Sequence, residues 1–305
     1  MAKLMMGTEE VLKVMMGSEE VTSLFMGSEE IPSSGSPEPQ PVVDYSTMPF
    51  TIEALTSGDL VFTLIGDNNQ SPFIGWDYSV NDGASQTYQW TGPSPQPLTI
   101  SLSAGDKVTF VSHNASQEGC GYLQTIYGGF ANSTLDFNAY GNLLSLSYID
   151  FTNYDAYNSK GFQRLFMDSR IVSAENLVFP SGDVTASARE MFCNCSGLTT
   201  APKVLPAQTI GGYSYNKMVY GCTSLEKSPE LLFTGTTGFY SCQEMFKGDT
   251  SLNYIKCLAQ VGNSNGRFNN WVSDVAATGT FVKDANTTWS TGSAGIPTGW
   301  AVVDA

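Results

Sequence analysis

The sequence predicts a mainly β protein with short helices: an N-terminal segment of β repeats, a β-sandwich domain, and a C-terminal solenoid of longer repeats with a cap. A ten-residue unit recurs at the start, short apolar runs alternate with turn residues in the middle, and another unit recurs every 26 to 27 residues from Phe162. Recurrence at a fixed period is typical of stacked structural units. The predicted boundaries are 1–31 for the β repeats, 32–43 for a Pro/Ser linker, 44–157 for the sandwich, 158–260 for the solenoid and 261–305 for the cap.

The N-terminal unit reads MMGTEEV at 5–11, MMGSEEV at 15–21 and FMGSEEI at 25–31. Each apolar pair is followed by Gly-Ser or Gly-Thr, which favours a tight turn, so the unit predicts strand, turn and strand. An even period keeps equivalent side chains on the same strand face in every copy. Short helices are the alternative, because Glu-Glu after Ser resembles a first helical turn. Strands are favoured, since a Gly in every copy would cost about 1 kcal/mol in a helix interior.

Short strands with exposed Met and Phe do not form a core alone and require a partner surface. We therefore expect an attachment segment that also self-associates, as a trimer because three copies of the chain could close a β-prism. The residues expected to carry attachment and oligomerisation are Met5, Met6, Val11, Val14, Met16, Val21, Phe25, Met26 and Ile31. The Pro-rich stretch at 32–41 that follows predicts a semi-rigid spacer of roughly 30 Å.

The charge balance excludes several partners. The chain of 305 residues carries 14 Lys+Arg against 29 Asp+Glu, a net charge of −15, and contains no basic run. Clustered Lys and Arg supply most of the affinity for nucleic acid and for anionic lipid, so neither is an expected partner. No apolar stretch reaches the ~18 residues that a membrane span needs. We recognise no secretion or lipoprotein signal, and we therefore expect a chain made in a cytoplasm.

Residues 44–157 alternate short apolar runs with turn residues. The runs predict strands at Thr51–Leu55, Leu60–Ile65, Phe73–Tyr78, Leu98–Leu102 and Lys107–Val111, with a further apolar run at Asn142–Leu146. Turn signals between them include Ser57-Gly58-Asp59, Asn81-Asp82-Gly83 and Ala104-Gly105-Asp106. Short strands at this spacing favour a small antiparallel sandwich.

The second repeat places apolar residues at equal offsets in four registers. Its units open at Leu165-Phe166, Met191-Phe192, Met218-Val219 and Met245-Phe246. Each unit predicts a short helix, a turn and a short strand, stacked so that neighbours bury each other's apolar edge. The expected core is Met191, Leu198, Val204, Met218, Leu225, Leu231, Met245, Leu252 and Leu258. Trp271, Trp289 and Trp300 are expected to cap the open end.

Six cysteines occur, at 120, 193, 195, 222, 242 and 257. One C-x-C pair and no C-x2-C pair argue against a zinc site. Five of the six lie in the second repeat, where a small apolar side chain suffices, so we expect free, buried thiols. Cys195, Cys222 and Asp249 share one repeat position, which predicts that they stack.

The repeat units carry a family resemblance. MFCNCSGLTTAP at 191–202 and MVYGCTSL at 218–225 resemble the MFxGCTSLTxAP repeats of BspA-like leucine-rich-repeat proteins. In the tail, TGTFVK at 278–283 and GIPTGW at 295–300 resemble the ending that those proteins share. The resemblance covers roughly residues 140 to 305 and implies a leucine-rich-repeat solenoid. In bacterial members it implies surface adhesion and host contact, and it implies no catalytic residues.

The opening decapeptides resemble the N-terminal repeats of head-fibre and tail-associated proteins in phages of Bacteroidales, including crAss-like phages. This resemblance implies a virion structural protein, a head fibre or decoration fibre, located on the virion. The expected partners are further copies of the chain, the major capsid or another virion protein, and a host surface glycan or protein. The alternatives are a bacterial BspA-like cell-surface adhesin and a tail-associated receptor-binding or polysaccharide-cleaving protein.

Groups that could carry chemistry have simpler structural explanations. His113 is the only histidine, and no nucleophile lies near it in the sequence. Asp67-Asn68-Asn69 and Asn81-Asp82-Gly83 could offer oxygens to calcium, but hairpin turns explain them better. A sugar-stacking surface would come from Asp150, Asp155, Tyr148, Tyr154 and Tyr157, for which loop packing is the favoured explanation. We therefore expect no catalytic residue, no metal ion and no cofactor, and a protein that is not an enzyme.

Overall fold

The computed structural model describes residues 15–16, 19–20, 24–26, 29–31, 43–64, 75–89, 96–113, 128–147, 162–180, 188–236, 238–259 and 266–305. These residues are mainly β, arranged in several sheets, and the one helix among them is the short 3-10 helix η1, Leu143–Leu146. The chain divides into two compact units, Met1–Asp44 and Tyr45–Ala305. The regions predicted as sandwich, solenoid and cap thus lie in a single unit.

The first unit contains two hairpins of the same design. Strands β1 (Met15–Met16) and β2 (Glu19–Glu20) pair antiparallel, as do β3 (Leu24–Met26) and β4 (Glu29–Ile31). Their registers are equivalent, because Met15 lies opposite Glu20 just as Phe25 lies opposite Glu30. The ten-residue period is therefore the period of one hairpin. Of the predicted attachment residues, Met16, Phe25, Met26 and Ile31 lie in these strands, whereas Met5, Met6, Val11, Val14 and Val21 lie outside the described residues.

Antiparallel strands form the first part of the second unit. They are β5 (Phe50–Ala54), β6 (Gly58–Leu64), β7 (Gly75–Val80), β8 (Gln86–Gln89), β9 (Leu98–Leu102), β10 (Lys107–Ser112), β11 (Gly128–Gly129) and β12 (Phe137–Asn142). One sheet contains the order β12-β5-β10-β7-β8, and a smaller sheet has the order β11-β6-β9. The five strands predicted in this region are confirmed, with small shifts in their bounds.

These two sheets face each other across an aromatic core. The Phe62 ring on β6 lies 4.6 Å from the Trp76 ring on β7, and the Phe130 ring lies 5.2 Å from that of Phe62, measured between centroids. The indole Nε1 of Trp76 donates a hydrogen bond to the Leu146 carbonyl at 3.0 Å, which ties η1 to the core. Burial alternates along β9, as expected for a strand with one solvated face.

Strand β12 joins the antiparallel region to a parallel one. Strands β13 (Ile171–Ser173) and β14 (Leu177–Val178) both pair parallel with β12. Gly141 in β12 has a φ of +86°, and a Cβ atom there would overlap the Pro49 carbonyl oxygen, so only glycine fits. The Phe137 and Phe166 rings lie 6.2 Å apart. The core therefore runs across residue 157, where the sequence predicted a boundary.

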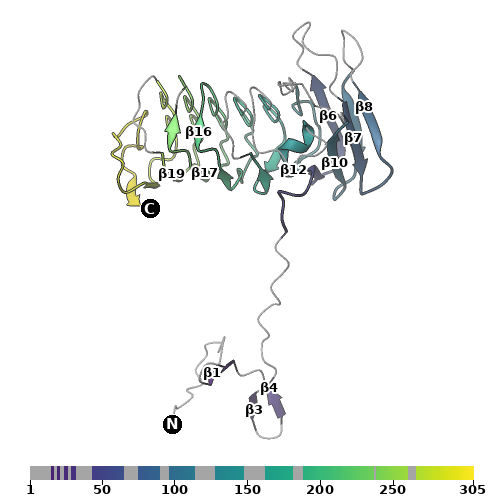
Figure 1. Cartoon of the computed structure of the whole chain (residues 1–305), viewed down its shortest axis with the longest axis horizontal. Helices are drawn as coiled ribbons and strands as arrows, with labels where there is room; N and C mark the ends of the chain where they lie inside the picture. The colour runs from purple at the N-terminus through teal and green to yellow at the C-terminus, as the bar shows by residue number, and fades with distance from the viewer. Residues whose placement is uncertain are drawn as a thin grey trace. The chain divides into compact units, whose positions relative to one another are not determined.

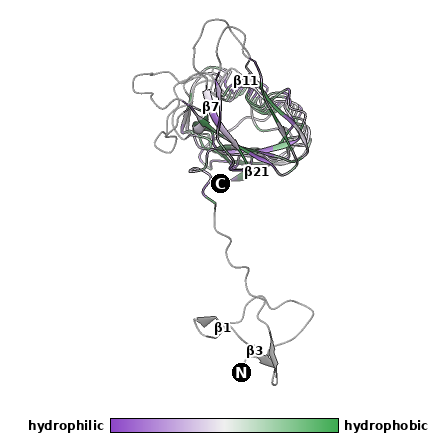
Figure 2. Ribbon diagram, turned by 90° about the vertical axis from the view of Figure 1, so that its right-hand side faces the viewer, coloured by the Kyte–Doolittle hydropathy of each residue, from purple (hydrophilic) through white to green (hydrophobic). Residues whose placement is uncertain are grey.

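The rest of the second unit consists of segments that lie side by side in parallel (Figure 1). The strands are β15 (Val204–Leu205), β16 (Thr209–Ile210), β17 (Lys227–Leu231), β18 (Gly235–Thr236), β19 (Tyr254–Cys257), β20 (Thr280–Lys283) and β21 (Ala301–Asp304). One parallel sheet has the order β15-β17-β19-β20-β21, and β16 pairs with β18. We call residues 162–180, 188–210, 211–236, 238–259 and 266–283 segments 1 to 5. Figure 2 views them from one end, where successive segments lie behind one another.

The short helices predicted at the start of each repeat are wrong, because consecutive turns take their place. In segment 2 the N–H of Met191 donates to the Ala188 carbonyl within the turn, whereas the N–H of Phe192 donates to Met218 in segment 3. Glu190 has a φ of +54°, and such left-handed residues recur at every fourth position. An α-helix tolerates neither feature. Alternate N–H groups are thus used to bind one segment to the next.

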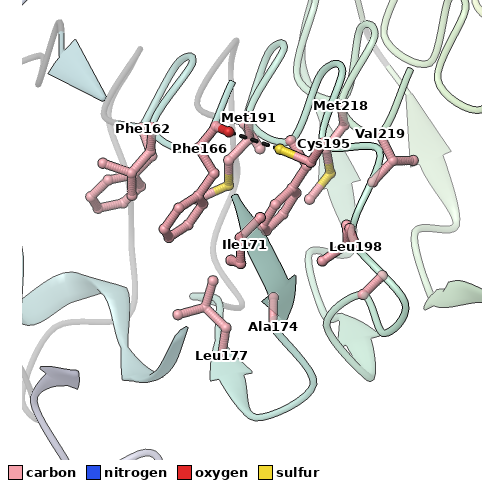
Figure 3. Close-up of a cluster of buried hydrophobic side chains, with 14 of the residues drawn as sticks. Phe162, Phe166, Ile171, Ala174, Leu177, Met191, Cys195, Leu198, Met218 and Val219 are labelled. Atoms are coloured by element: carbon pink, nitrogen blue, oxygen red, sulfur yellow. Dashed lines mark hydrogen bonds between the residues drawn. The ribbon is translucent and has the colours of Figure 1, made fainter. Parts of the chain in front are cut away.

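Seven of the nine predicted core residues are fully buried: Met191, Leu198, Met218, Leu225, Leu231, Met245 and Leu252. Figure 3 shows Met191, Leu198 and Met218 in the shared apolar cluster with Phe166. Val204 and Leu258 are half-buried instead, and Leu205 and Cys257 take the positions next to Leu231. The cause is an irregularity in β17 between Lys227 and Glu230, where the spacing between pairing partners changes from 27 (Lys227 to Tyr254) to 26 (Glu230 to Lys256) residues.

Buried cysteines form a column through the segments. Among the described residues, Cys193, Cys195, Cys222, Cys242 and Cys257 are free and buried, as predicted, while Cys120 lies outside them. The Cys195 thiol donates to the Phe166 carbonyl at 2.8 Å (Figure 3), and the Cys222 thiol makes the equivalent bond to Phe192 at 3.1 Å. Asp249 continues the column, since its Oδ1 accepts a hydrogen bond from the Cys222 N–H. The predicted stacking of these three residues is confirmed.

The three C-terminal tryptophans pack at segment 5. The Trp271 and Trp289 rings stack at 5.5 Å with an angle of 18° between their planes. The indole Nε1 of Trp271 donates to the Gly295 carbonyl, and that of Trp300 donates to the Ala276 carbonyl, both at 2.8 Å. Residues 285–300 are thereby held against the last segment, in the position that the sequence predicts for a cap.

Candidate binding face

The tips of the turns form one face of segments 1 to 5, which we call the turn face. In segment 3, Met218 and Val219 are fully buried, whereas Lys217 before them and Tyr220 after them are partly exposed. Equivalent tips line up in rows because N–H groups join each segment to the next. The left-handed tip residues are Tyr213, Tyr240 and Gly266 in row 1, Arg164, Glu190, Lys217, Glu244 and Asn270 in row 2, and Asp168, Asn194, Gly221, Gly248 and Asp274 in row 3.

The turn geometry explains part of this choice of residues. A turn whose third residue has a positive φ favours glycine there, or asparagine and aspartate, whose short side chains tolerate the left-handed region. Row 3 contains only these types. Larger side chains are disfavoured in this conformation by about 1–2 kcal/mol each. Rows 1 and 2 carry such side chains, so their tips are the candidates for a role beyond the turn itself.

Row 2 is a ladder of ion pairs. Glu190 accepts from Arg164 at 2.5 Å and from Arg189 at 3.2 Å. The next carboxylate in the row is held in the same way. Glu244 pairs with Lys217 at 3.3 Å and with Lys247 at 3.1 Å.

The pKa of Glu244 follows from this arrangement. Partial burial alone would raise the pKa of Glu244, but hydrogen bonds from Lys247 and Lys217 lower it below its usual value. Each carboxylate in the ladder thus neutralises the cations beside it. The cations of row 2 are committed to neighbouring segments and are not free for an external anion.

Row 1 carries an aromatic cluster formed by Tyr213, Phe239 and Tyr240. The Tyr213 and Tyr240 rings lie 5.5 Å apart and the Phe239 and Tyr240 rings 6.4 Å apart. The guanidinium of Arg189 lies 5.5 Å from the centre of the Tyr213 ring, a cation–π distance. Phe239 is 61% exposed and Tyr213 is 40% exposed. This cluster presents apolar ring surface directly to solvent.

Amide side chains stand next to the aromatic cluster. Asn216, at the neighbouring tip in segment 3, donates from its Nδ2 to both the backbone carbonyl and the Oε1 of Gln243, at 3.3 Å each. Gln243 is partly exposed. Rings beside amides make a surface that can stack on an apolar face and also bond to hydroxyl groups.

His113 lies far from the turn face in sequence, at the end of β10. Its Nδ1 is 2.8 Å from Asp77 Oδ1, which also accepts from the Thr87 hydroxyl at 2.6 Å. Burial acts to raise the pKa of Asp77, but these two partners and the charge of the imidazole lower it overall. The group ties β7, β8 and β10 together across one sheet. The arrangement is structural, as the sequence indicated.

The other predicted candidates also have structural roles where they are described. Asn81 and Asp82 have φ of 51° and 55° in the β7–β8 hairpin turn, which confirms the turn interpretation. Burial, reinforced by the charges of Glu190 and Asp168, raises the pKa of Cys193 to about 11, so it remains a thiol rather than a metal-binding thiolate. The segment Asp67–Asn69 and the cluster Tyr148, Asp150, Tyr154, Asp155 and Tyr157 lie outside the described residues.

Searches for two general features gave negative results within the described ranges. No group of three or more His, Cys, Asp or Glu side chains there is arranged to hold a metal ion. No helix in the same ranges has the length and apolarity of a membrane span.

Sequence reasoning missed the aromatic cluster and the ion ladder. Tyr213 and Tyr240 are 27 residues apart, the interval at which Lys217 and Glu244 also recur. Following the exposed positions of the repeat as well as the buried ones would have revealed both rows.

Comparisons were made with protein-family models, curated proteins and solved structures. None of these matched the chain.

Proposed function

We propose that this chain is a structural protein of a bacteriophage particle, a head fibre or decoration fibre. It docks on the particle through its N-terminal hairpins, associates as a trimer, and presents the turn face to the surface of the host cell. It acts by binding and is not an enzyme. One observation carries the proposal: hairpins of equivalent register recur every ten residues in a compact unit of their own.

The register explains why these hairpins need a partner. Residues directly opposite in an antiparallel pair share a face, so Leu24 and Ile31 lie on one face, and Met26 lies there too because it is two residues beyond Leu24. A two-stranded hairpin is marginally stable at best and has no second layer to cover these side chains. The capsid or another virion protein, together with further copies of this chain, would supply that layer.

The second unit supports the display side of the proposal. Its parallel segments, paired at intervals of 26 and 27 residues (Val204 with Glu230, Lys227 with Tyr254), fit a leucine-rich-repeat solenoid of the BspA-like kind behind a β-sandwich domain. Rows of equivalent tips offer the same chemistry several times along one surface. Many copies on one particle would add avidity, so each contact can be weak.

The test uses particles assembled with altered chains. Deleting residues 1–31 should abolish incorporation while the rest of the chain keeps the circular dichroism and melting temperature of the intact protein. A matched control carries the same residues 1–31 in scrambled order, and it should also fail to incorporate. Wild-type levels of either variant on purified particles would refute docking through the hairpins.

The alternatives predict different outcomes. A bacterial surface adhesin should be recovered in the outer-membrane fraction of the cell that makes it. A polysaccharide-cleaving protein should shorten purified capsule chains, as measured by gel filtration. We expect neither result.

A further inference from the structure

Tyr213 and Tyr240 occupy turn positions that a tyrosine fits poorly. Their φ values are 58° and 57°, in the left-handed region that bulky residues avoid. Gly266 stands at the equivalent position of segment 5 with a φ of 67°, so glycine meets the backbone requirement without strain. Strained residues that persist at a surface point to a role of their side chains.

Packing does not account for the rings. Tyr213 is 40% exposed, and its neighbour Phe239 is 61% exposed. The tilt of 43° between the Tyr213 and Tyr240 planes leaves an open, angled ledge in place of a closed stack. Most apolar side chains of this size in the segments are buried, so an exposed group of three stands out.

The chemistry around the ledge favours an uncharged ligand. Arg189 is paired with Glu190 at 3.2 Å and Lys217 with Glu244 at 3.3 Å, so the nearest cations are already neutralised. The chain as a whole has a net charge of −15, which repels polyanions. The partly exposed Gln243 amide beside the rings can exchange hydrogen bonds with hydroxyl groups.

We propose that the ledge formed by Tyr213, Phe239 and Tyr240 binds a neutral polysaccharide. The C–H face of a pyranose ring is flat and apolar, and it packs on an aromatic ring by dispersion and by release of water. Its hydroxyl groups point sideways, toward the amides. This inference rests on the proposed function, since it names the host ligand that the turn face would meet.

The experiment uses the full chain and two variants, Tyr213→Gly and Tyr240→Gly. The probes are neutral polymers (a glucan, a mannan and a galactan) and the acidic polymer polygalacturonate, with affinity measured by titration calorimetry. Asp274→Gly is the matched control, because it makes the same backbone change at an exposed left-handed tip in row 3, where φ is 61°. Melting temperatures of all variants are measured in parallel.

We expect at least one neutral polymer to bind and each tyrosine substitution to weaken that binding about ten-fold. Glycine relieves the left-handed strain at the substituted position, so the variants should stay folded, and Asp274→Gly should bind like the wild type. Binding of polygalacturonate alone, binding of no neutral polymer, or equal affinity of the tyrosine variants would overturn the inference.

A second readout separates this inference from the proposed function. Labelled wild-type chain is applied to host cells with and without protease treatment. Adsorption that survives protease and falls in Tyr240→Gly supports the ledge. Adsorption that is lost after protease treatment, or that is equal in Tyr240→Gly, overturns the glycan inference while leaving adhesion standing. No adsorption of the wild-type chain refutes adhesion itself.

Discussion

The Oδ1 atom of Asp249 accepts a hydrogen bond from the Cys222 N–H at 2.8 Å, although the Asp249 side chain is completely buried. The other oxygen, Oδ2, has no partner. Burial raises the pKa of Asp249 well above its usual value, against the smaller lowering effect of the bonds from Cys222 and Gly221. A carboxylic acid thus occupies a position that cysteine fills in the two preceding segments.

Asp249→Asn should change how stability depends on pH. Because the folded pKa lies above the unfolded value near 4, the contribution of Asp249 is fully present below pH 4 and is lost as pH rises toward the folded pKa. Asparagine keeps the acceptor and cannot ionise. The variant should therefore gain on the wild type by about 1.4 kcal/mol per pH unit within that window. Urea unfolding at pH 4 to 8 measures the difference, and parallel curves would contradict the assignment.

Glu244→Gln should act in the opposite direction. The pKa of Glu244 is lowered, so its stabilising contribution is present above its unfolded value near 4.3 and is lost as pH falls through the folded pKa. At pH 7 the variant should lose about 0.5–1 kcal/mol, since its lysine partners are partly exposed. At pH 3 the two proteins should unfold alike. A deficit that persists at pH 3 would point to packing in place of charge.

Gly141→Ala should destabilise the junction between the antiparallel and parallel regions. The new Cβ atom would meet the Pro49 carbonyl, in addition to the penalty for a φ of +86°. Gly105→Ala is the matched control, because Gly105 has a φ of +90° and nothing within 4 Å of the added atom. We expect a loss of about 1 kcal/mol for the control and a several-fold larger loss for Gly141→Ala. Equal losses in urea denaturation would refute the close approach.

Leu252→Ala and Leu258→Ala should separate the observed register from the predicted one. Leu252 is fully buried, and its truncation should cost about 2–5 kcal/mol. Leu258 is only half-buried, beside the interior Cys257, and its truncation should cost clearly less. Similar losses for both would mean that the simple thirteen-residue offset describes the core after all.

The sequence was sufficient to predict features that repetition makes visible. The hairpin period, the column of Cys195, Cys222 and Asp249, and most of the buried repeat positions follow from residue spacing alone. The five strands of the antiparallel region follow from apolar runs between turn residues. The lone histidine and the Asn81-Asp82 turn were also interpreted correctly.

Other features depend on backbone geometry that spacing does not encode. An apolar pair such as Met218-Val219 fits an inward helical turn and two successive β-turns equally well, and left-handed residues such as Lys217 decide between them. The irregularity in β17 shifts the register by one residue, which no period analysis of apolar residues reveals. The aromatic ledge needed the knowledge that Tyr213 and Tyr240 lie at exposed tips.

The hydrogen bonds between segments have a mechanical consequence. The N–H of Phe192 reaches Met218, and that of Val219 reaches Met245, so each segment is fastened only to its two neighbours. Tension applied along the direction of stacking loads one interface at a time. Under such a load the molecule would peel from a terminal segment inward, extending in steps of one segment and absorbing work at each step.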